Sequence, residues 1–387
     1  MNKKELELYI HIPFCVRKCS YCDFLSAPAT EQTREAYMAA LFAEIGGRAK
    51  DYSDRTVTSI FIGGGTPSLL SGEQIGQLMD RIREQFAMAQ DAEITMEVNP
   101  GTVSAEKLRN FYTAGINRLS IGMQSAQAEE LKNLGRIHDF EGFCQVYREA
   151  VEAGFTNINV DIMSGLPGQT LASYRDTLEK VLHLEPMPQH ISAYSLIVEE
   201  GTPFAAMAER GELPLPEEET ERAMYEETIE VLAKYGFHRY EISNYARDGY
   251  ECRHNVGYWI RRDYLGFGIG AASLIDNVRF QNEKSLGAYL AHPLESREEE
   301  QTLTVQERME ETMFLGLRLT RGVSCVDFVE QYGRTVEEVY GEVIARNVAD
   351  GLLTVTERKE NQKKDRFLAL TKRGLDLSNY VMAQFLF

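Results

Sequence analysis

The chain of 387 residues contains no run of about 18 apolar residues, so we expect no membrane-spanning helix. Residues 1–6 lack the apolar stretch of a secretory signal, so we expect a cytoplasmic protein. Basic residues are few relative to acidic ones: the chain has 41 Lys and Arg and 59 Asp and Glu, which gives a net charge of −18. Such an acidic chain is a poor general binder of phosphates, so we expect no nucleic acid partner.

Cysteine is also scarce, and its distribution is uneven. Of the six cysteines, three lie close together as Cys15, Cys19 and Cys22, and the other three are scattered. Disulfide frameworks belong to small secreted domains, and this chain is neither short nor led by a secretory signal. We therefore predict that the clustered thiols are metal ligands rather than disulfide partners.

The first half of the chain alternates between strand and helix patterns. Before about residue 235 we count six strand–helix repeats, and Gly, Asn or other polar residues follow most of the strands. Strands that alternate with helices predict a parallel sheet. Six repeats are too few for a closed eight-stranded barrel, so we predict an α/β fold built on a partial, TIM-like (β/α)6 barrel. The predicted strands cover residues 6–12, 57–62, 94–98, 116–121, 157–162 and 190–197.

The rest of the chain predicts two further units. Residues 1–235 form the barrel core, and residues 236–300 form a β-rich extension that ends in a linker marked by His292-Pro293 and Glu298–Glu300. Residues 301–387 combine helices with a β-hairpin around a charged turn at 357–365, which indicates a small winged-helix-like α+β domain. Winged helices often bind DNA, but this segment shows no basic stripe.

The three clustered cysteines follow the first predicted strand with the spacing C-x3-C-x2-C. Three thiolates can hold three irons of a 4Fe–4S cluster, which leaves the fourth iron open to a non-protein ligand. An open coordination position distinguishes a reactive metal centre from a structural one. The alternative is a structural zinc site with His11 as the fourth ligand.

Polar or glycine residues also follow the other predicted strands. Gly63-Gly64-Gly65-Thr66-Pro67 ends the second strand, and its glycines can let free N–H groups meet a ligand carboxylate or can simply form a tight turn. The third, fourth and fifth strands end near Glu97, Gln124 and Asp161. The Arg136 guanidinium could bind a carboxylate through two hydrogen bonds. Each of these residues could instead be an ordinary solvated side chain without a binding role. All of them, however, are expected at the same end of the sheet.

These motifs carry a resemblance. The C-x3-C-x2-C loop resembles the radical S-adenosylmethionine (SAM) superfamily, in which the open iron binds SAM and reduction yields a 5′-deoxyadenosyl radical. Together with G-G-G-T-P, E-x-N-P, S-x-G-x-Q, G-R-x-H and N-x-D-x-x-x-G-L-P-G-Q-T, the chain resembles the oxygen-independent coproporphyrinogen III oxidase family over essentially its whole length. The resemblance implies that SAM contacts Tyr9, Tyr21, Gly63, Gly64, Thr66, Glu97, Gln124, Arg136 and Asp161.

Two departures separate the chain from the dehydrogenases of that family. Those enzymes carry a further cysteine two residues after the third, where this chain has Phe24, and they extend further before the cysteine loop, where this chain has eight residues before Tyr9. Both features resemble the haem chaperone branch of the family, HemW. That branch also has an H-N-x-x-Y-W motif, here residues 254–259.

The motif offers groups that suit haem. His254 and the nearby Cys252 are candidate axial ligands, and Tyr258 and Trp259 supply flat apolar faces. The alternative is that His254 caps a loop and that Trp259, the only tryptophan, fills a core.

The resemblance therefore implies a haem chaperone that binds haem, one 4Fe–4S cluster and SAM, and delivers haem to acceptor proteins. No residue is assigned a catalytic role, and an electron donor is expected. The alternative function is a radical SAM coproporphyrinogen III dehydrogenase, which decarboxylates two propionates to vinyl groups. A zinc protein with a DNA-binding winged helix is a third hypothesis. The sequence leaves the oligomeric state open, a dimer included.

Overall fold

A computed structural model describes residues 4–360 and 363–386 of the chain. Its described strands form one large sheet in the order β12-β11-β10-β9-β1-β2-β3-β4-β5-β6-β8-β7, and a small second sheet. The central strands run parallel, and β12 and β7 end the order, so the predicted open barrel is confirmed. The parallel strands are β1 (Lys4–Ile12), β2 (Arg55–Gly64), β3 (Ala87–Val98), β4 (Arg118–Gln124), β5 (Ile158–Ser164) and β6 (His190–Ser195).

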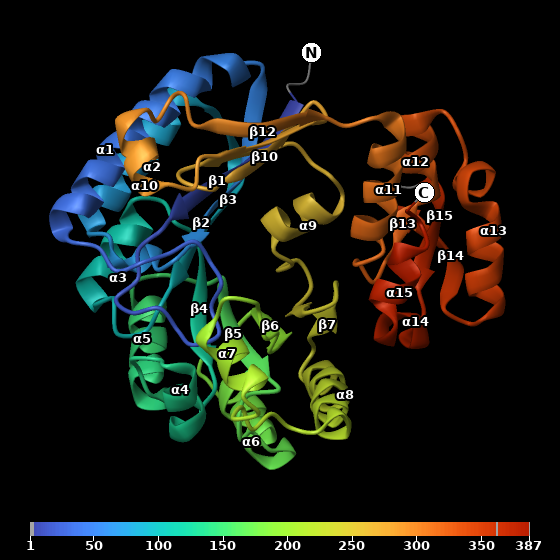
Figure 1. Ribbon diagram of the computed structural model, residues 1–387, viewed down its shortest axis with the longest axis horizontal. Helices are drawn as coiled ribbons and strands as arrows, with labels where there is room; N and C mark the ends of the chain where they lie inside the picture. The colour runs from blue at the N-terminus through green and yellow to red at the C-terminus, as the bar shows by residue number, and fades with distance from the viewer. Residues whose placement is uncertain (1–3, 361–362, 387) are drawn as a thin grey trace.

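Helices connect these strands and cover the outer face of the sheet (Figure 1). Many of them begin at a Ser, Thr or Asp cap, as at Ser104, whose side chain accepts a hydrogen bond from the Lys107 N–H at 3.3 Å. The helices are α1 (Glu31–Arg48), α2 (Gly72–Gln85), α3 (Ala105–Thr113), α4 (Ala128–Leu134), α5 (Phe140–Glu152), α6 (Leu171–Leu182), α7 (Pro203–Glu209) and α8 (Glu218–Lys234), with short 3-10 turns η1 (Ala49–Tyr52) and η2 (Pro67–Leu69).

The β-rich extension adds strands to both edges of the main sheet. β8 pairs with β6, and β9 pairs in parallel with β1. The predicted linker at Glu298–Glu300 is wrong, because this segment lies in β12 and pairs with β11. The elements are β7 (His238–Arg239), β8 (Asn244–Ala246), α9 (Arg253–Trp259), β9 (Tyr264–Phe267), β10 (Ala272–Ile275), β11 (Val278–Asn282), α10 (Leu286–Ala291) and β12 (Arg297–Thr302).

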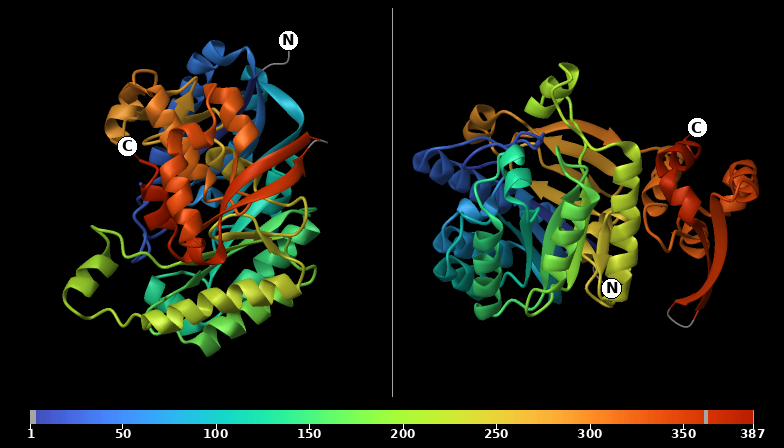
Figure 2. Two further views of the ribbon diagram at one scale, coloured as in Figure 1. Left: turned by 90° about the vertical axis from the view of Figure 1, so that its right-hand side faces the viewer. Right: turned by 90° about the horizontal axis from the view of Figure 1, so that it is seen from below.

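The C-terminal unit has a hydrophobic core of its own and stands beside the open edge of the barrel (Figure 2). The charged turn predicted at 357–365 is largely strand, because Glu357 faces Arg366 and Arg358 faces Asp365 across a longer hairpin. Residues 361–362 of that turn lie outside the described residues. The elements are α11 (Val305–Gly316), β13 (Val323–Ser324), α12 (Cys325–Tyr332), α13 (Val336–Ala349), β14 (Leu353–Glu360), β15 (Lys363–Leu370), α14 (Lys372–Asp376) and α15 (Ser378–Ala383).

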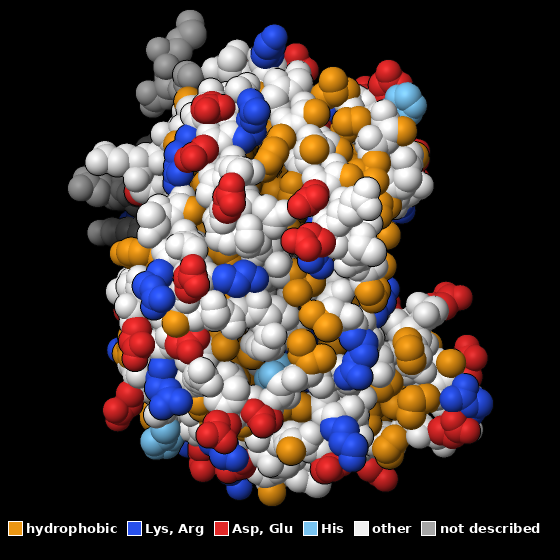
Figure 3. Space-filling view, turned by 90° about the vertical axis from the view of Figure 1, so that its left-hand side faces the viewer, with side chains coloured by type: hydrophobic (Ala, Val, Ile, Leu, Met, Phe, Trp, Pro, Cys, Tyr) orange, Lys and Arg blue, Asp and Glu red, His pale blue; other side chains and the backbone are white. Residues whose placement is uncertain are grey.

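Two surface features bear on partners. Within the described residues, no helix is both long and apolar enough to cross a bilayer. On the face shown in Figure 3, acidic and basic side chains are interspersed, and the segment around α7 stands out from the body. The domain boundaries at residues 235 and 300 stay predictions, although the separate core of the C-terminal unit is consistent with the second of them.

Candidate functional site

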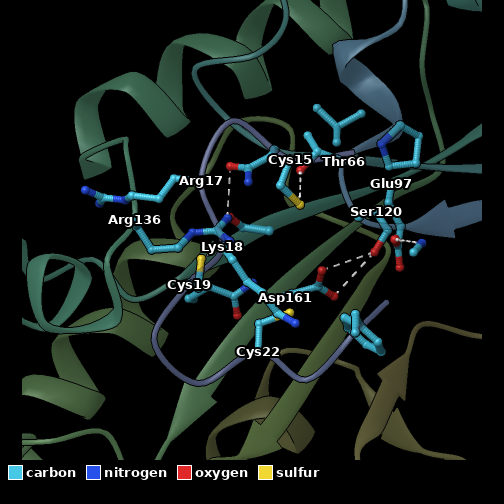
Figure 4. Close-up of a pocket in the computed structure, with 18 of the residues that line it drawn as sticks. Cys15, Arg17, Lys18, Cys19, Cys22, Thr66, Glu97, Ser120, Arg136 and Asp161 are labelled. Carbon is cyan, nitrogen blue, oxygen red and sulfur yellow. Dashed lines mark hydrogen bonds between the residues drawn. The ribbon is translucent and has the colours of Figure 1, made fainter. Parts of the chain in front are cut away.

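The loop that follows β1 brings the three clustered thiols to one cavity at the carboxyl ends of the parallel strands (Figure 4). Backbone bonds hold the loop at two points, from the Cys15 N–H to the Ala27 carbonyl at 3.2 Å and from the Ser20 N–H to the Leu134 carbonyl at 3.1 Å. The cavity has a volume of about 140 Å³. These two bonds anchor the loop at Cys15 and beside Cys19 without using a sulfur atom.

The cavity surrounds the thiols with hydrogen-bond donors. The Thr66 hydroxyl donates to the Cys15 Sγ at 3.4 Å, and the Arg136 guanidinium donates to the Cys19 Sγ at 3.9 Å. Donors and a cation next to sulfur stabilise thiolates and tune an iron–sulfur cluster. In the described part of the chain no group of three or more His, Cys, Asp or Glu converges on a single ion position. The donor set of three thiols without a fourth protein ligand suits a cluster with one open iron.

His11, the fourth ligand of the zinc alternative, is already engaged. Its Nδ1 is hydrogen-bonded to the Tyr9 hydroxyl at 3.0 Å, and its Nε2 to the Leu25 carbonyl at 2.8 Å. Since both ring nitrogens have partners, neither is free to complete a tetrahedral zinc site. The structure therefore does not favour the zinc hypothesis.

The glycine-rich turn after β2 connects β3 and the cysteine loop through hydrogen bonds. Gly64 has φ +109°, and a Cβ there would lie 2.5 Å from the His11 ring, so only glycine fits. Of the two alternatives for these glycines, the structure favours the tight turn, because the N–H groups already have partners within the protein. The N–H groups of Gly64, Gly65 and Thr66 donate to Glu97 Oε2 at 3.0 Å, to the Ile12 carbonyl at 2.8 Å and to the Phe14 carbonyl at 2.7 Å. The turn thus holds Glu97 and the cysteine loop in place.

Two carboxyl groups face this cavity, Glu97 from β3 and Asp161 from β5, the strands on either side of β4. Asp161 accepts a hydrogen bond from the Ser120 hydroxyl at 3.3 Å (Figure 4). It also accepts one from the Asn159 amide at 2.7 Å. Burial, with the nearby Asp161 charge, raises the pKa of Glu97 to about 8, and burial also raises the pKa of Asp161. Glu97 is therefore largely protonated at neutral pH, as a hydrogen-bond donor and acceptor.

The cavity gathers most, but not all, of the residues that the resemblance implied for SAM. Tyr9 and Gly63 do not line it, and the Tyr9 hydroxyl is taken by His11. Asn99 and Ser120 also line it, and their place in the E-x-N-P and S-x-G-x-Q motifs was the signal that could have found them. The predicted residues that line the cavity are Tyr21, Gly64, Thr66, Glu97, Gln124, Arg136 and Asp161.

The H-N-x-x-Y-W motif lies on α9, a helix that sequence reasoning missed. His254 is 1% exposed, and its ring is hydrogen-bonded to the Ser59 hydroxyl at 2.9 Å and to the Tyr258 hydroxyl at 3.0 Å. Cys252 is fully buried against Glu93, and Trp259 stacks under the Arg318 guanidinium at 4.5 Å. In this conformation neither candidate ligand presents a free donor atom to a cavity, so an iron reaches His254 only if the ring leaves both partners.

A second cavity, of about 330 Å³, adjoins the first and shares seven lining residues with it: Tyr21, Cys22, Phe24, Glu97, Ser120, Gln124 and Asp161. Its walls come from β4, β5 and β6 and from the segment after β6. Asn255 is the one residue of the motif that lines it. Phe61, another lining residue, stacks on the His254 ring with 5.3 Å between ring centroids. The motif therefore supports the floor of this cavity.

Glu7 on β1 is a buried carboxyl group beneath α9, 3.8 Å from His254 Nδ1 and 3.3 Å from the Arg262 guanidinium. Burial raises its pKa to about 8. An acid whose pKa is raised in the folded state holds a proton that the unfolded chain releases, so stability falls as pH rises from its ordinary value through about 8. We expect Glu7→Gln to melt a few degrees higher than the parent at about pH 9, with the difference shrinking toward about pH 5.

Thermal unfolding across this pH range measures the effect. Glu141→Gln is the matched control, because Glu141 is exposed on α5 and should give no such pH-dependent difference. A Glu7→Gln protein that melts below the parent at every pH would contradict a neutral Glu7 in the folded state.

Comparison with known proteins gives consistent results for both halves of the chain. Residues 9–181 match the profile of the radical SAM superfamily, and residues 303–377 match that of the HemN C-terminal domain. The protein named heme chaperone HemW from Bacillus subtilis is 38% identical over 385 residues, 98% of this chain and 98% of that protein. HemW from Lactococcus lactis is 36% identical over 387 residues, 100% of this chain and 98% of that protein.

A solved structure agrees with the fold. Coproporphyrinogen III oxidase (HemN) from Escherichia coli, described as a radical SAM enzyme, superposes with a TM-score of 0.83. The match covers 99% of this chain and 90% of that one, at 27% identity.

Proposed function

The chain belongs to the HemW family of haem chaperones, and we propose that it binds haem beside a 4Fe–4S cluster and SAM and hands the haem to acceptor proteins. The observation that carries the proposal is the pair of adjoining cavities. One gathers three thiols and two carboxyl groups, and the other has an apolar rim and rests on the H-N-x-x-Y-W helix. An electron donor, a dimer and a cytoplasmic location remain predictions.

In this proposal Cys15, Cys19 and Cys22 hold three irons of the cluster. When bound, a 4Fe–4S cluster with one open iron binds SAM and supplies one-electron chemistry at its sulfonium. Arg136 fixes one end of the site, because its guanidinium also donates to the Asn99 side chain at 3.1 Å and to the Gly122 carbonyl at 2.6 Å. These bonds hold the guanidinium beside the Cys19 sulfur.

The remaining cavity residues suit SAM. Glu97 and Asp161 present carboxyl oxygens to ribose hydroxyls, and Gln124 sits at the strand end with φ 68°. Gly64 and Thr66 act through the turn that holds Glu97 and Cys15. Tyr9 holds the His11 ring through its hydroxyl, and Gly63 lies against the Glu97 side chain, where a Cβ would come within 3.0 Å of Glu97 Oε2. Both roles differ from the direct contact that the resemblance implied.

Haem is the cargo in this proposal, and the cavity that adjoins the thiols is its proposed site. Phe24 stands at the rim of that cavity and is 61% exposed, at the position where the dehydrogenases carry a cysteine. An exposed aromatic ring at a cavity mouth offers a flat apolar face to a porphyrin. His254 supports the floor, and its role as an axial ligand stays a prediction.

The proposal is tested by two assays on anaerobically reconstituted protein. Haem titration should change the Soret band and quench the fluorescence of Trp259, the only tryptophan. Incubation with SAM, reductant and coproporphyrinogen III should yield no protoporphyrinogen. Protoporphyrinogen formation would favour the dehydrogenase alternative, and no haem binding would refute the chaperone.

His254→Ala separates the two roles of the motif histidine. We expect weaker haem binding, because the Phe61 ring loses its support. If His254 only supports the floor, the Soret band of the bound haem keeps its position. If His254 ligates iron, the band moves.

A further inference from the structure

The cavity beside the thiols has an apolar mouth and a polar inner end. Its mouth is formed by Phe24, Tyr194 and Ile197, which are 61%, 39% and 66% exposed. Its inner wall carries the polar side chains of the parallel strands, among them Arg118 and Ser192. A cavity built this way suits a ligand with a flat apolar body and a polar end.

Arg118, the first residue of β4, is the charged group at the inner wall. It is 2% exposed and is the largest side chain among those that are almost fully buried. Among the described residues its guanidinium makes one long hydrogen bond, to the Thr95 hydroxyl at 3.5 Å, and its Nε has no partner. No described carboxylate lies within ion-pair distance of it. A buried cation without a paired anion is costly, so its retention at a cavity wall points to an anionic ligand.

The nearest carboxylates are committed elsewhere. Glu93 accepts hydrogen bonds from the N–H groups of Arg253 at 3.2 Å and His254 at 3.3 Å, which anchor the start of α9. Asp161 accepts from Asn159 and Ser120. Both act on Arg118 only at longer range. Their charges lower the cost of burying the guanidinium but leave its donors free for a ligand.

SAM does not account for this arginine. Arg118 lines the second cavity and is not among the residues around the thiols, where Arg136 already offers a guanidinium beside Cys19. Arg118 is therefore available to a ligand of the second cavity whose polar end lies at the inner wall.

We propose that Arg118 receives a propionate carboxylate of haem, with the porphyrin body lying between the apolar mouth and Phe61. The inference rests on the proposed haem-carrying function and names the anchor of that site. Its chemistry is that of any tetrapyrrole propionate, so the experiment compares haem with coproporphyrin III. The helix that carries the H-N-x-x-Y-W motif supports the same cavity, since Asn255 lines it and the His254 ring stacks on Phe61.

The test compares haem with haem dimethyl ester, in which both propionates are esterified, on reconstituted wild-type protein and on Arg118→Met. Wild-type protein should bind the ester at least tenfold more weakly than haem, since a charge-assisted hydrogen bond in a buried site is lost. Arg118→Met should bind both equally, with haem affinity reduced at least tenfold. Arg109→Met is the matched control, because Arg109 is exposed on α3. Arg118→Lys should restore part of the discrimination.

Each outcome decides the inference. Wild-type protein that binds haem and its ester equally well would overturn the inference but leave the chaperone proposal standing. This comparison uses wild-type protein alone, so it does not depend on whether a variant folds. Arg118→Met protein that still prefers haem as strongly as wild type would also overturn it. Tighter binding of coproporphyrin III than of haem would overturn haem as the occupant. Wild-type protein that binds no haem would refute the proposed function and this inference with it.

Discussion

Replacing Cys19 by serine is expected to abolish the iron–sulfur cluster while leaving the fold intact. A serine hydroxyl is a poor ligand for iron, and a cluster held by three thiolates has no protein ligand to spare. The loop itself should persist, because its anchors at Cys15 and Ser20 are backbone hydrogen bonds. Iron and sulfide in anaerobically reconstituted Cys19→Ser protein should fall to near zero, and the brown absorbance should be lost.

Cys144→Ser is the matched control for this experiment. Cys144 is a half-buried cysteine on α5, away from the thiol cavity, so its replacement should leave iron content unchanged. Melting of the cluster-free parent and of Cys19→Ser should coincide. A Cys19→Ser protein that keeps a full complement of iron would contradict the assignment of this thiol.

The second large effect is expected at Glu97. Glu97→Ala should weaken SAM binding by a factor on the order of ten to a hundred, because the carboxyl group is proposed to bind ribose hydroxyls and also accepts the Gly64 N–H at 3.0 Å. Equilibrium binding of SAM to reconstituted protein measures this change. Iron content should stay at the wild-type level, which separates a SAM defect from a cluster defect.

Glu97→Gln tests the protonation state at the same position. Because the pKa of Glu97 is raised to about 8, the residue is largely neutral at pH 7, and glutamine should retain most of the affinity. Glu141→Ala, exposed on α5, should bind SAM as the parent does. Unchanged affinity in Glu97→Ala would remove this residue from the SAM site.

Elements with a strong local signal were predictable from the sequence. The helix Phe140–Glu152 carries such signals, because Asp139 caps it by accepting the Gly142 N–H at 2.8 Å and its apolar face repeats at helical spacing. The end of the third strand at Val98 was also predictable, because Asn99, Pro100 and Gly101 follow a buried run. The position of the three cysteines at the strand ends followed from that pattern.

Other parts depend on tertiary contacts that no local pattern reveals. The sequence of β12 predicts a charged linker, because its residues are polar and lie exposed on both faces. Only its pairing with β11 makes it a strand. α9 is a short helix whose buried His254 is held by Ser59 from β2. Arg118 belongs to no motif, and only its burial without an ion pair marks it out.

The sequence located the glycine-rich turn but left its role open between binding a ligand carboxylate and forming a tight turn. In the folded chain the Gly64 N–H donates to Glu97 from β3, and the N–H groups of Gly65 and Thr66 donate to carbonyls of the segment around Pro13. These partners come from distant segments and become visible only in the folded chain. The likeness in sequence located the site, and the structure assigned the turn its positioning role.

The most direct test of the account is the response of the reduced cluster to SAM, measured by electron paramagnetic resonance on anaerobically reconstituted protein. The account predicts a low-spin signal from the reduced cluster whose g-values shift when SAM is added, because SAM completes the coordination of the one iron that no cysteine holds. A signal that is identical with and without saturating SAM would contradict an open iron site, and with it the proposed arrangement of cluster, SAM and haem.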